Sequence, residues 1–156
     1  MEKVDYLIEC KELFERKLRV KFGEPVGLTE AALLVLEERL EVSFPAAYRQ
    51  YLLWMGMDKN GVLRGSEWFA DDLSDNQDFL TELLAENEVT GASTGKKVCF
   101  FSHQGYMAAW FLADASELDP FCEFYSEADA HPSVKKVGRF SDFLLKELSG
   151  IVENIR

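Results

Sequence analysis

Phosphate chemistry is the first activity that the residue types suggest. The stretch Gly91–Lys97 (GASTGKK) combines glycines, hydroxyl side chains and lysines. A phosphate-binding loop needs four residues between its glycines, followed by Lys and then Ser or Thr at the start of a helix. Here three residues separate the glycines, Lys97 stands in the hydroxyl position, and a strand-like sequence follows. The stretch therefore indicates a flexible connection, and we expect no nucleotide site there.

Nucleophilic or metal chemistry would require the cysteines or the histidines. The chain has three cysteines, Cys10, Cys99 and Cys122, and no CxxC pair. This argues against a zinc site and a disulfide framework, and it favours a reducing compartment. Neither His103 nor His131 lies four residues from another ligand on a helix. A cysteine–histidine pair, such as Cys122 with His103, stays open as a hydrolase hypothesis. We expect no metal, no cofactor and no catalytic residue.

Carboxylates are the most abundant ionisable groups in the chain. Its 156 residues include 28 Asp plus Glu against 17 Lys plus Arg, a net charge of −11. This balance excludes a domain-wide basic footprint for DNA or RNA and disfavours binding to an anionic membrane. The same excess of negative charge speeds the encounter with a basic protein.

The acidic residues fall into two tracts without Lys or Arg. Residues 65–95 hold eight acids: Glu67, Asp71, Asp72, Asp75, Asp78, Glu82, Glu86 and Glu88. Residues 98–134 hold six: Asp114, Glu117, Asp119, Glu123, Glu127 and Asp129. If the tracts converge in space, they form a surface that attracts a basic protein. The alternative is that each tract is the solvated face of its own segment.

Trp68 precedes most of the first tract, in a segment (57–73) that reads as a loop. An exposed aromatic side chain among carboxylates is typical of an interface anchor. The alternative is that Trp68 folds back onto the core.

The elements that position these residues follow from the hydrophobic period. We predict helices over residues 2–20, from Thr29 to about Glu41, from Pro45 to Gly56, from Ser74 to about Glu88, and from Ser141 onward. Short aromatic runs at 97–101, 107–113 and 121–125 predict strands, with a fourth near 134–138. The connections are too short for crossover helices, so the sheet should be antiparallel. We expect one α+β domain over residues 1–156, with N-terminal helices, a central antiparallel sheet and a C-terminal helix.

Nothing in the sequence predicts export or membrane insertion. The N-terminus lacks a charged-then-apolar signal pattern, and no apolar run approaches the ~20 residues of a membrane span. We expect a cytoplasmic protein.

Two stretches resemble a known family, the SUKH superfamily. Thr29-Glu30, Leu36-Glu37 and the run Ser43–Gly56 (SFPAAYRQYLLWMG) resemble its N-terminal signature, and Arg139–Leu144 (RFSDFL) resembles its closing helix. The aromatic strands between them also fit its sheet, and the similarity spans most of residues 28–150. Met55 stands where the family often has Asn, and the acidic segment 65–95 has no counterpart in it.

The resemblance implies an α+β fold and an adaptor without catalysis. Many bacterial members of the family are thought to be immunity proteins that neutralise a cognate toxin, often a nuclease. Fungal relatives act as regulatory scaffolds.

Charge and resemblance together predict a non-catalytic immunity protein whose acidic surface binds a basic toxin domain, possibly a nuclease. The alternative is a regulatory or scaffolding module unrelated to toxins. We expect no nucleic acid or membrane partner, and the oligomeric state stays open. The candidate partner-binding residues are Trp68 as anchor and, as complementary charges, Asp71, Asp72, Asp75, Asp78, Glu82, Glu117, Asp119 and Glu127.

Overall fold

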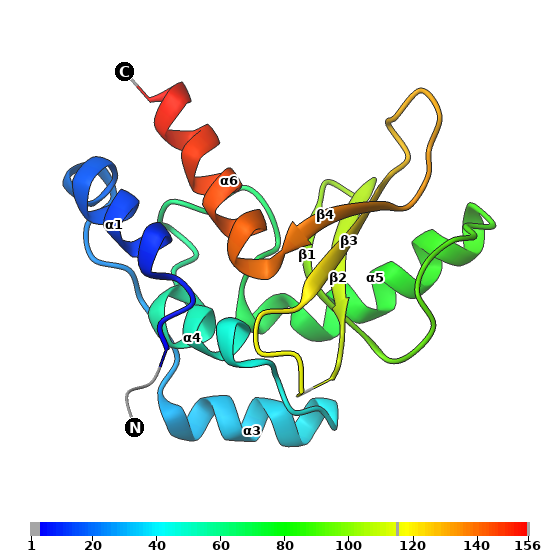
Figure 1. Ribbon diagram of the computed structural model, residues 1–156, viewed down its shortest axis with the longest axis horizontal. Helices are drawn as coiled ribbons and strands as arrows, with labels where there is room; N and C mark the ends of the chain where they lie inside the picture. Colours follow the sequence, from blue (N-terminus) through cyan, green and yellow to red (C-terminus); the bar gives the residue numbers. More distant parts are fainter. Residues whose placement is uncertain (1–3, 115, 156) are drawn as a thin grey trace.

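The computed structural model describes residues 4–114 and 116–155 (Figure 1). The chain forms helices first, then four strands, then a last helix. The elements are α1 (Ile8–Lys17), α2 (Arg19–Phe22), α3 (Glu30–Leu40), α4 (Ala46–Met55), the 3-10 turn η1 (Ala70–Asp72), α5 (Leu73–Glu86), β1 (Lys97–His103), β2 (Met107–Leu112), β3 (Phe121–Ser126), β4 (Lys135–Arg139) and α6 (Phe140–Asn154). The predicted α+β class is confirmed.

The four strands form one antiparallel sheet in the order β1-β2-β3-β4. Each strand pairs with its neighbour in sequence, as short connections require. The register shifts between Cys99 and Phe101 in β1 and between Phe121 and Glu123 in β3. The predicted antiparallel sheet, including its fourth strand, is confirmed.

The two faces of the sheet carry different helices. On one face, α4 and α6 bring Tyr48 and Phe140 against Phe100 and Phe111, with ring centroids 5.1 Å apart for Phe100 and Phe140. On the other face, α5 covers a smaller cluster that includes Leu80 and Trp110. Figure 1 shows the sheet between α5 on one side and α4 and α6 on the other. The outer side of α5 therefore takes no part in core packing.

A side-chain amide fastens α5 to β1. Gln77 accepts a hydrogen bond from the Cys99 backbone N–H (2.8 Å) and donates one to the Cys99 carbonyl (2.9 Å). Both backbone groups of Cys99 lie at the register shift of β1, where the strand pairing is interrupted and backbone N–H and C=O groups need other hydrogen-bond partners. The position and facing of α5 are thereby fixed.

The segment 57–73 is ordered against the sheet. Glu67 and Ser102 form an isolated antiparallel bridge at the outer edge of β1, with backbone hydrogen bonds of 2.9 and 3.3 Å. The edge of β1 is thus paired at Ser102. At the other edge, β4 has no further strand beside it among the described residues, and it carries Lys135, Lys136 and Arg139.

The predicted N-terminal helix is too long. Of the predicted range 2–20, residues 2 and 3 lie outside the described part of the chain, and Val4–Tyr6 precede the helix. Asp5 accepts a hydrogen bond from the Leu7 N–H (3.0 Å) and pairs with Lys11, which holds the entry to α1 in a non-helical turn. Helix α1 ends at Lys17 and is followed by the short α2.

Candidate protein-binding surface

The outer side of α5 carries a row of carboxylates. Asp75, Asp78, Glu82 and Glu86 follow the i, i+3, i+7, i+11 spacing of one helix face and are all exposed. None of them forms an ion pair or a side-chain hydrogen bond with the residues that the structure describes. We call these four residues the α5 acidic face.

Part of the α5 acidic face opposes the folding of its helix, although Asp75 in the first turn is favoured by the helix dipole. Like charges at i, i+4, as in Asp78–Glu82 and Glu82–Glu86, each destabilise a helix by about 0.2–0.5 kcal/mol. Glu86 also lies in the last turn, where the helix dipole disfavours an anion, and no basic residue lies in that turn. The carboxylates at this end of α5 are therefore a cost to stability.

Two other predicted residues of this tract have structural partners. Asp71 forms an ion pair with Lys59 at 2.9 Å. Asp72 accepts a hydrogen bond from the Phe69 backbone N–H (3.1 Å) and so closes the turn that begins η1. Asp71 and Asp72 lie at the N-terminal end of α5, but their carboxylates already have partners within the protein.

Trp68 lies in the core, so its prediction as an exposed anchor is wrong. Its side chain is 1% exposed and packs on Tyr51, Phe101 and Phe143. The Trp68 carbonyl accepts a hydrogen bond from the Tyr51 hydroxyl at 2.7 Å. Because the preceding residue, Glu67, pairs with β1 and is exposed, strand alternation turns Trp68 inward.

The second acidic tract divides between two places. Glu127 lies at the C-terminal end of α5, where its carboxylate accepts a hydrogen bond from Asn87 (3.0 Å). Glu117 and Asp119 lie in the β2–β3 loop, which contacts α4 through the hydrogen bond from Ala47 N–H to the Leu118 carbonyl. The structure therefore brings Glu127 to the end of the α5 acidic face, whereas Glu117 and Asp119 lie in a loop that is held against α4.

Asp119 has a structural role. Its carboxylate accepts hydrogen bonds from the Ser141 backbone N–H (3.1 Å) and hydroxyl, and its carbonyl accepts one from Arg139. These contacts satisfy donors at the start of α6. Glu117 is exposed and lines a hollow of about 420 Å³ with Asp114 and Glu123.

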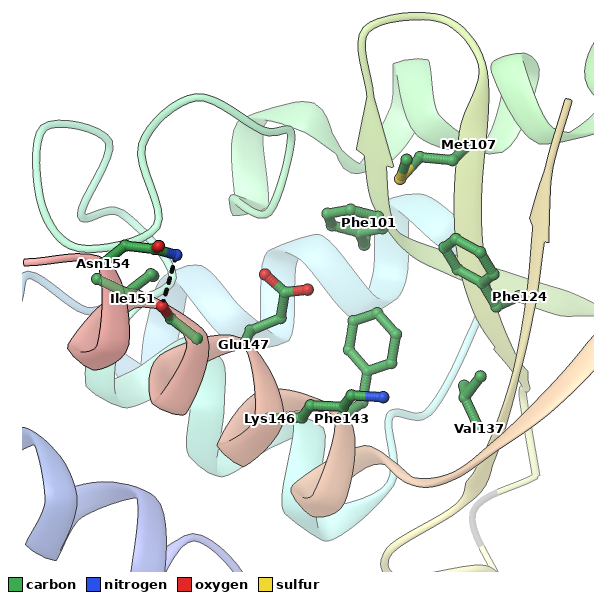
Figure 2. Close-up of a pocket in the computed structure, with 10 residues that line it drawn as sticks. Phe101, Met107, Phe124, Val137, Phe143, Lys146, Glu147, Ile151 and Asn154 are labelled. Atoms are coloured by element: carbon green, nitrogen blue, oxygen red, sulfur yellow. Dashed lines mark hydrogen bonds between the residues drawn. The ribbon is translucent and has the colours of Figure 1, made fainter. Parts of the chain in front are cut away.

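A groove between α6 and the sheet was missed from the sequence (Figure 2). Its volume is about 450 Å³, and its apolar lining includes Phe101, Met107, Phe124 and Phe143. Glu147 of α6 also lines it. The sequence of the predicted last helix does contain an indication of this groove. Glu147 follows Leu144 by three residues, so a carboxylate falls on the apolar face of that helix.

Glu147 is half-buried, and burial raises the pKa of its carboxyl above the ordinary value of 4.5. The charges of His103 and Lys146 lower this pKa in part. The His103 ring shares a hydrogen bond of 2.7 Å with the Ser66 hydroxyl through Nδ1. In Figure 2 the Lys146 amine points toward Val137, away from the Glu147 carboxylate.

The three thiols lie where they are hard to ionise. Burial raises the pKa of Cys10 and of Cys99 to about 12, and it raises that of Cys122 further. The Cys122 thiol lies against the Pro120 carbonyl, whereas His103 bonds to Ser66. The structure therefore does not pair Cys122 with His103. No group of three His, Cys, Asp or Glu side chains in the described ranges is arranged to hold a metal ion.

Comparison with known proteins adds no relative. This sequence matches no protein-family model and no curated protein. The resemblance to the SUKH superfamily stays a prediction that depends on its motif residues. In the described part of the chain, no helix is both long enough and apolar enough to cross a bilayer.

Proposed function

We propose that this chain is a non-catalytic immunity protein of the cytoplasm, which binds and neutralises a basic toxin domain through the α5 acidic face. The observation that supports the proposal is the row Asp75, Asp78, Glu82 and Glu86, exposed and without partners among the described residues. Glu82 and Glu86 oppose helix stability, so the benefit of these two charges lies outside folding. Glu127 extends the row at the end of α5.

A basic partner follows from charge complementarity. Nucleases and other proteins that hold phosphates carry clustered Lys and Arg. An acidic surface on a chain of net charge −11 steers such a partner and raises the association rate. Because exposed charges are screened over about 8 Å at physiological salt, the rate should fall steeply as salt is added.

The test is the association rate with a toxin domain, which is to be sought in a large secreted protein encoded beside this gene. Stopped-flow mixing would compare the wild type with the triple variant Asp75→Lys, Asp78→Lys, Glu82→Lys at several salt concentrations. We expect the variant to associate at least about tenfold more slowly at low salt, with most of its salt dependence lost.

A matched control separates this surface from net charge. Glu9, Glu12 and Glu38 are exposed and lie on α1 and α3, so changing all three to Lys alters the net charge equally. The control should retain most of the wild-type rate. If both triple variants slow association equally, the α5 acidic face is not the binding surface. No binding by the wild type would contradict the immunity function itself.

A regulatory or scaffolding module is the second candidate function. The groove beside α6 favours it, because its largely apolar lining suits a peptide or protein segment that buries apolar surface there. Association that is insensitive to salt and to the α5 substitutions would support this alternative.

A further inference from the structure

Glu147 differs from most of the half-buried carboxylates of this protein. Six of the seven other buried or half-buried carboxylates in the described residues form an ion pair or a hydrogen bond: Asp5 with Lys11, Glu37 with Arg49, Asp72 with Phe69 N–H, Asp119 with Ser141, Glu123 with Ser93 and Trp110, and Asp129 with Lys135. The seventh, Asp58, lies near the Val26 backbone. The Glu147 carboxylate receives no hydrogen bond or ion pair from the described residues. Its oxygens still reach water, unlike the Tyr48 hydroxyl, so a donor that enters the groove can pair with the carboxylate by displacing water.

The surroundings of Glu147 are aromatic. Figure 2 shows its carboxylate directed from α6 into the groove, toward Phe101 of β1. Phe124 of β3 and Phe143 of α6 also line the space, which has a volume of about 450 Å³. The best complement to the groove is therefore a group with an apolar body for the rings and a cationic donor for the carboxylate.

We propose that this groove is a docking site for an arginine side chain of a partner polypeptide. The guanidinium pairs with the Glu147 carboxylate, and the aliphatic stem lies against Phe101, Phe124 and Phe143.

Arginine fits this combination better than lysine. Its planar guanidinium stacks on aromatic faces and donates two parallel hydrogen bonds to a carboxylate, while lysine is a strongly hydrated point charge. The same protein shows both contacts with its own arginines. Arg139 lies 4.3 Å from the centre of the Phe121 ring, and Arg49 donates to Glu37 at 2.7 Å.

Two charged or titratable side chains border the site. Lys146 lies on α6 itself, and its amine points away from Glu147. His103 lies at the end of β1 and is engaged by Ser66. Both leave the Glu147 carboxylate without a bonded partner, so the incoming guanidinium does not have to displace a hydrogen bond.

The groove is independent of the α5 acidic face. Phe101 and Phe143 belong to the core on the α6 side of the sheet, whereas α5 covers the opposite side. The proposal therefore goes beyond the immunity function, and either could fail without the other.

The experiment is an NMR titration of the whole chain with a blocked peptide that holds one arginine between two leucines. The control peptide replaces arginine with citrulline, which has the same shape and no charge. We expect saturable shifts of the backbone amides that line the groove, with the citrulline peptide binding at least about tenfold more weakly. The Glu147 carboxyl pKa, followed by carbon-13 shifts, should fall when the arginine peptide binds, because a cation favours the charged form.

Two variants sharpen the titration. Glu147→Gln keeps the shape of the side chain and should reduce the affinity for the arginine peptide about tenfold, to that of the citrulline peptide. Glu153→Gln, an exposed position on the same helix, should leave binding unchanged.

Several outcomes would overturn the proposal. Equal binding of the two peptides would mean that only apolar burial matters. Shifts confined to α5, or no saturable shift up to about 5 mM peptide, would show that the groove does not bind the arginine peptide. Groove shifts that depend on protein concentration without peptide would assign the groove to a second copy of the chain. If the Glu147 pKa of the wild-type protein does not change when the arginine peptide is at saturation, the ion pair is excluded, and this result does not depend on any variant.

Discussion

Arg49 of α4 donates a hydrogen bond of 2.7 Å to the buried carboxylate of Glu37 on α3. The other carboxylate oxygen accepts the Phe44 backbone N–H, also at 2.7 Å. Both oxygens of Glu37 are thus used to hold the turn between the two helices. The same pair joins the two segments that resemble the SUKH signature, Leu36-Glu37 and Ser43–Gly56, so a physical reason exists for finding Glu and Arg at these positions.

Removing Glu37 should destabilise the fold. In Glu37→Ala, the Phe44 N–H loses its acceptor and Arg49 loses its counter-ion, while about a third of Arg49 remains in contact with water. We expect a loss of about 2–3 kcal/mol in the free energy of unfolding, measured by urea denaturation. Glu38→Ala, at an exposed neighbouring position, should cost under about 0.5 kcal/mol. Equal losses in both variants would mean that the pair is not responsible.

Two buried tyrosines should respond oppositely to loss of the hydroxyl. The Tyr48 hydroxyl is buried without a hydrogen-bond partner among the described residues, whereas the Tyr51 hydroxyl donates to the Trp68 carbonyl. Tyr48→Phe should be neutral or stabilising by up to about 1 kcal/mol, and Tyr51→Phe should cost about 1–2 kcal/mol. Thermal and urea unfolding of the two variants provide the measurement. A destabilised Tyr48→Phe would reveal a partner for that hydroxyl.

The pH dependence of stability should report on Glu147. Because its pKa is raised in the folded state, the folded protein binds the proton more tightly than the unfolded chain does. This group therefore makes the protein less stable as pH rises from the ordinary value of 4.5 through the folded pKa. Glu147→Gln should be more stable than the wild type at pH 7, and this difference should shrink as pH falls through the folded pKa and level off below 4.5. A difference that does not vary with pH would contradict the assignment.

Charge reversal at the end of α5 should stabilise the helix while it weakens binding. Glu86→Lys removes repulsion with Glu82 and places a cation near the helix C-terminus. We expect a gain of about 0.5 kcal/mol at low salt, which shrinks as salt is added. Glu30→Lys, at the start of α3, places a cation at the opposite helix end and should lose a similar amount. If Glu86→Lys is destabilising instead, the acidic residues contribute to the fold.

Local patterns were sufficient to predict most elements. The apolar spacing of Leu80 and Leu83 predicted α5, and the turn residues around the aromatic runs predicted the strands. The position of Trp68 could not be predicted in this way, because it depends on Glu67 pairing with Ser102, 35 residues away. The separation of Asp119 from the α5 acidic face has the same cause, since Ser141 holds Asp119 at the start of α6. Long-range pairing decides both positions, and the helical period carries no information about it.

The uncovered edge of β4 has a consequence for how copies of this protein behave in a crowded cell. In the symmetric antiparallel register, a second molecule placed alongside β4 would bring Lys135 opposite Arg139 and Lys136 opposite Gly138, with about 5 Å between the paired strands. The positive charges of Lys135 and Arg139 repel one another at that spacing, although the protein as a whole carries a net negative charge. The sheet therefore resists growth into fibres at the β4 margin, where its backbone is not shielded by its own chain within the described residues.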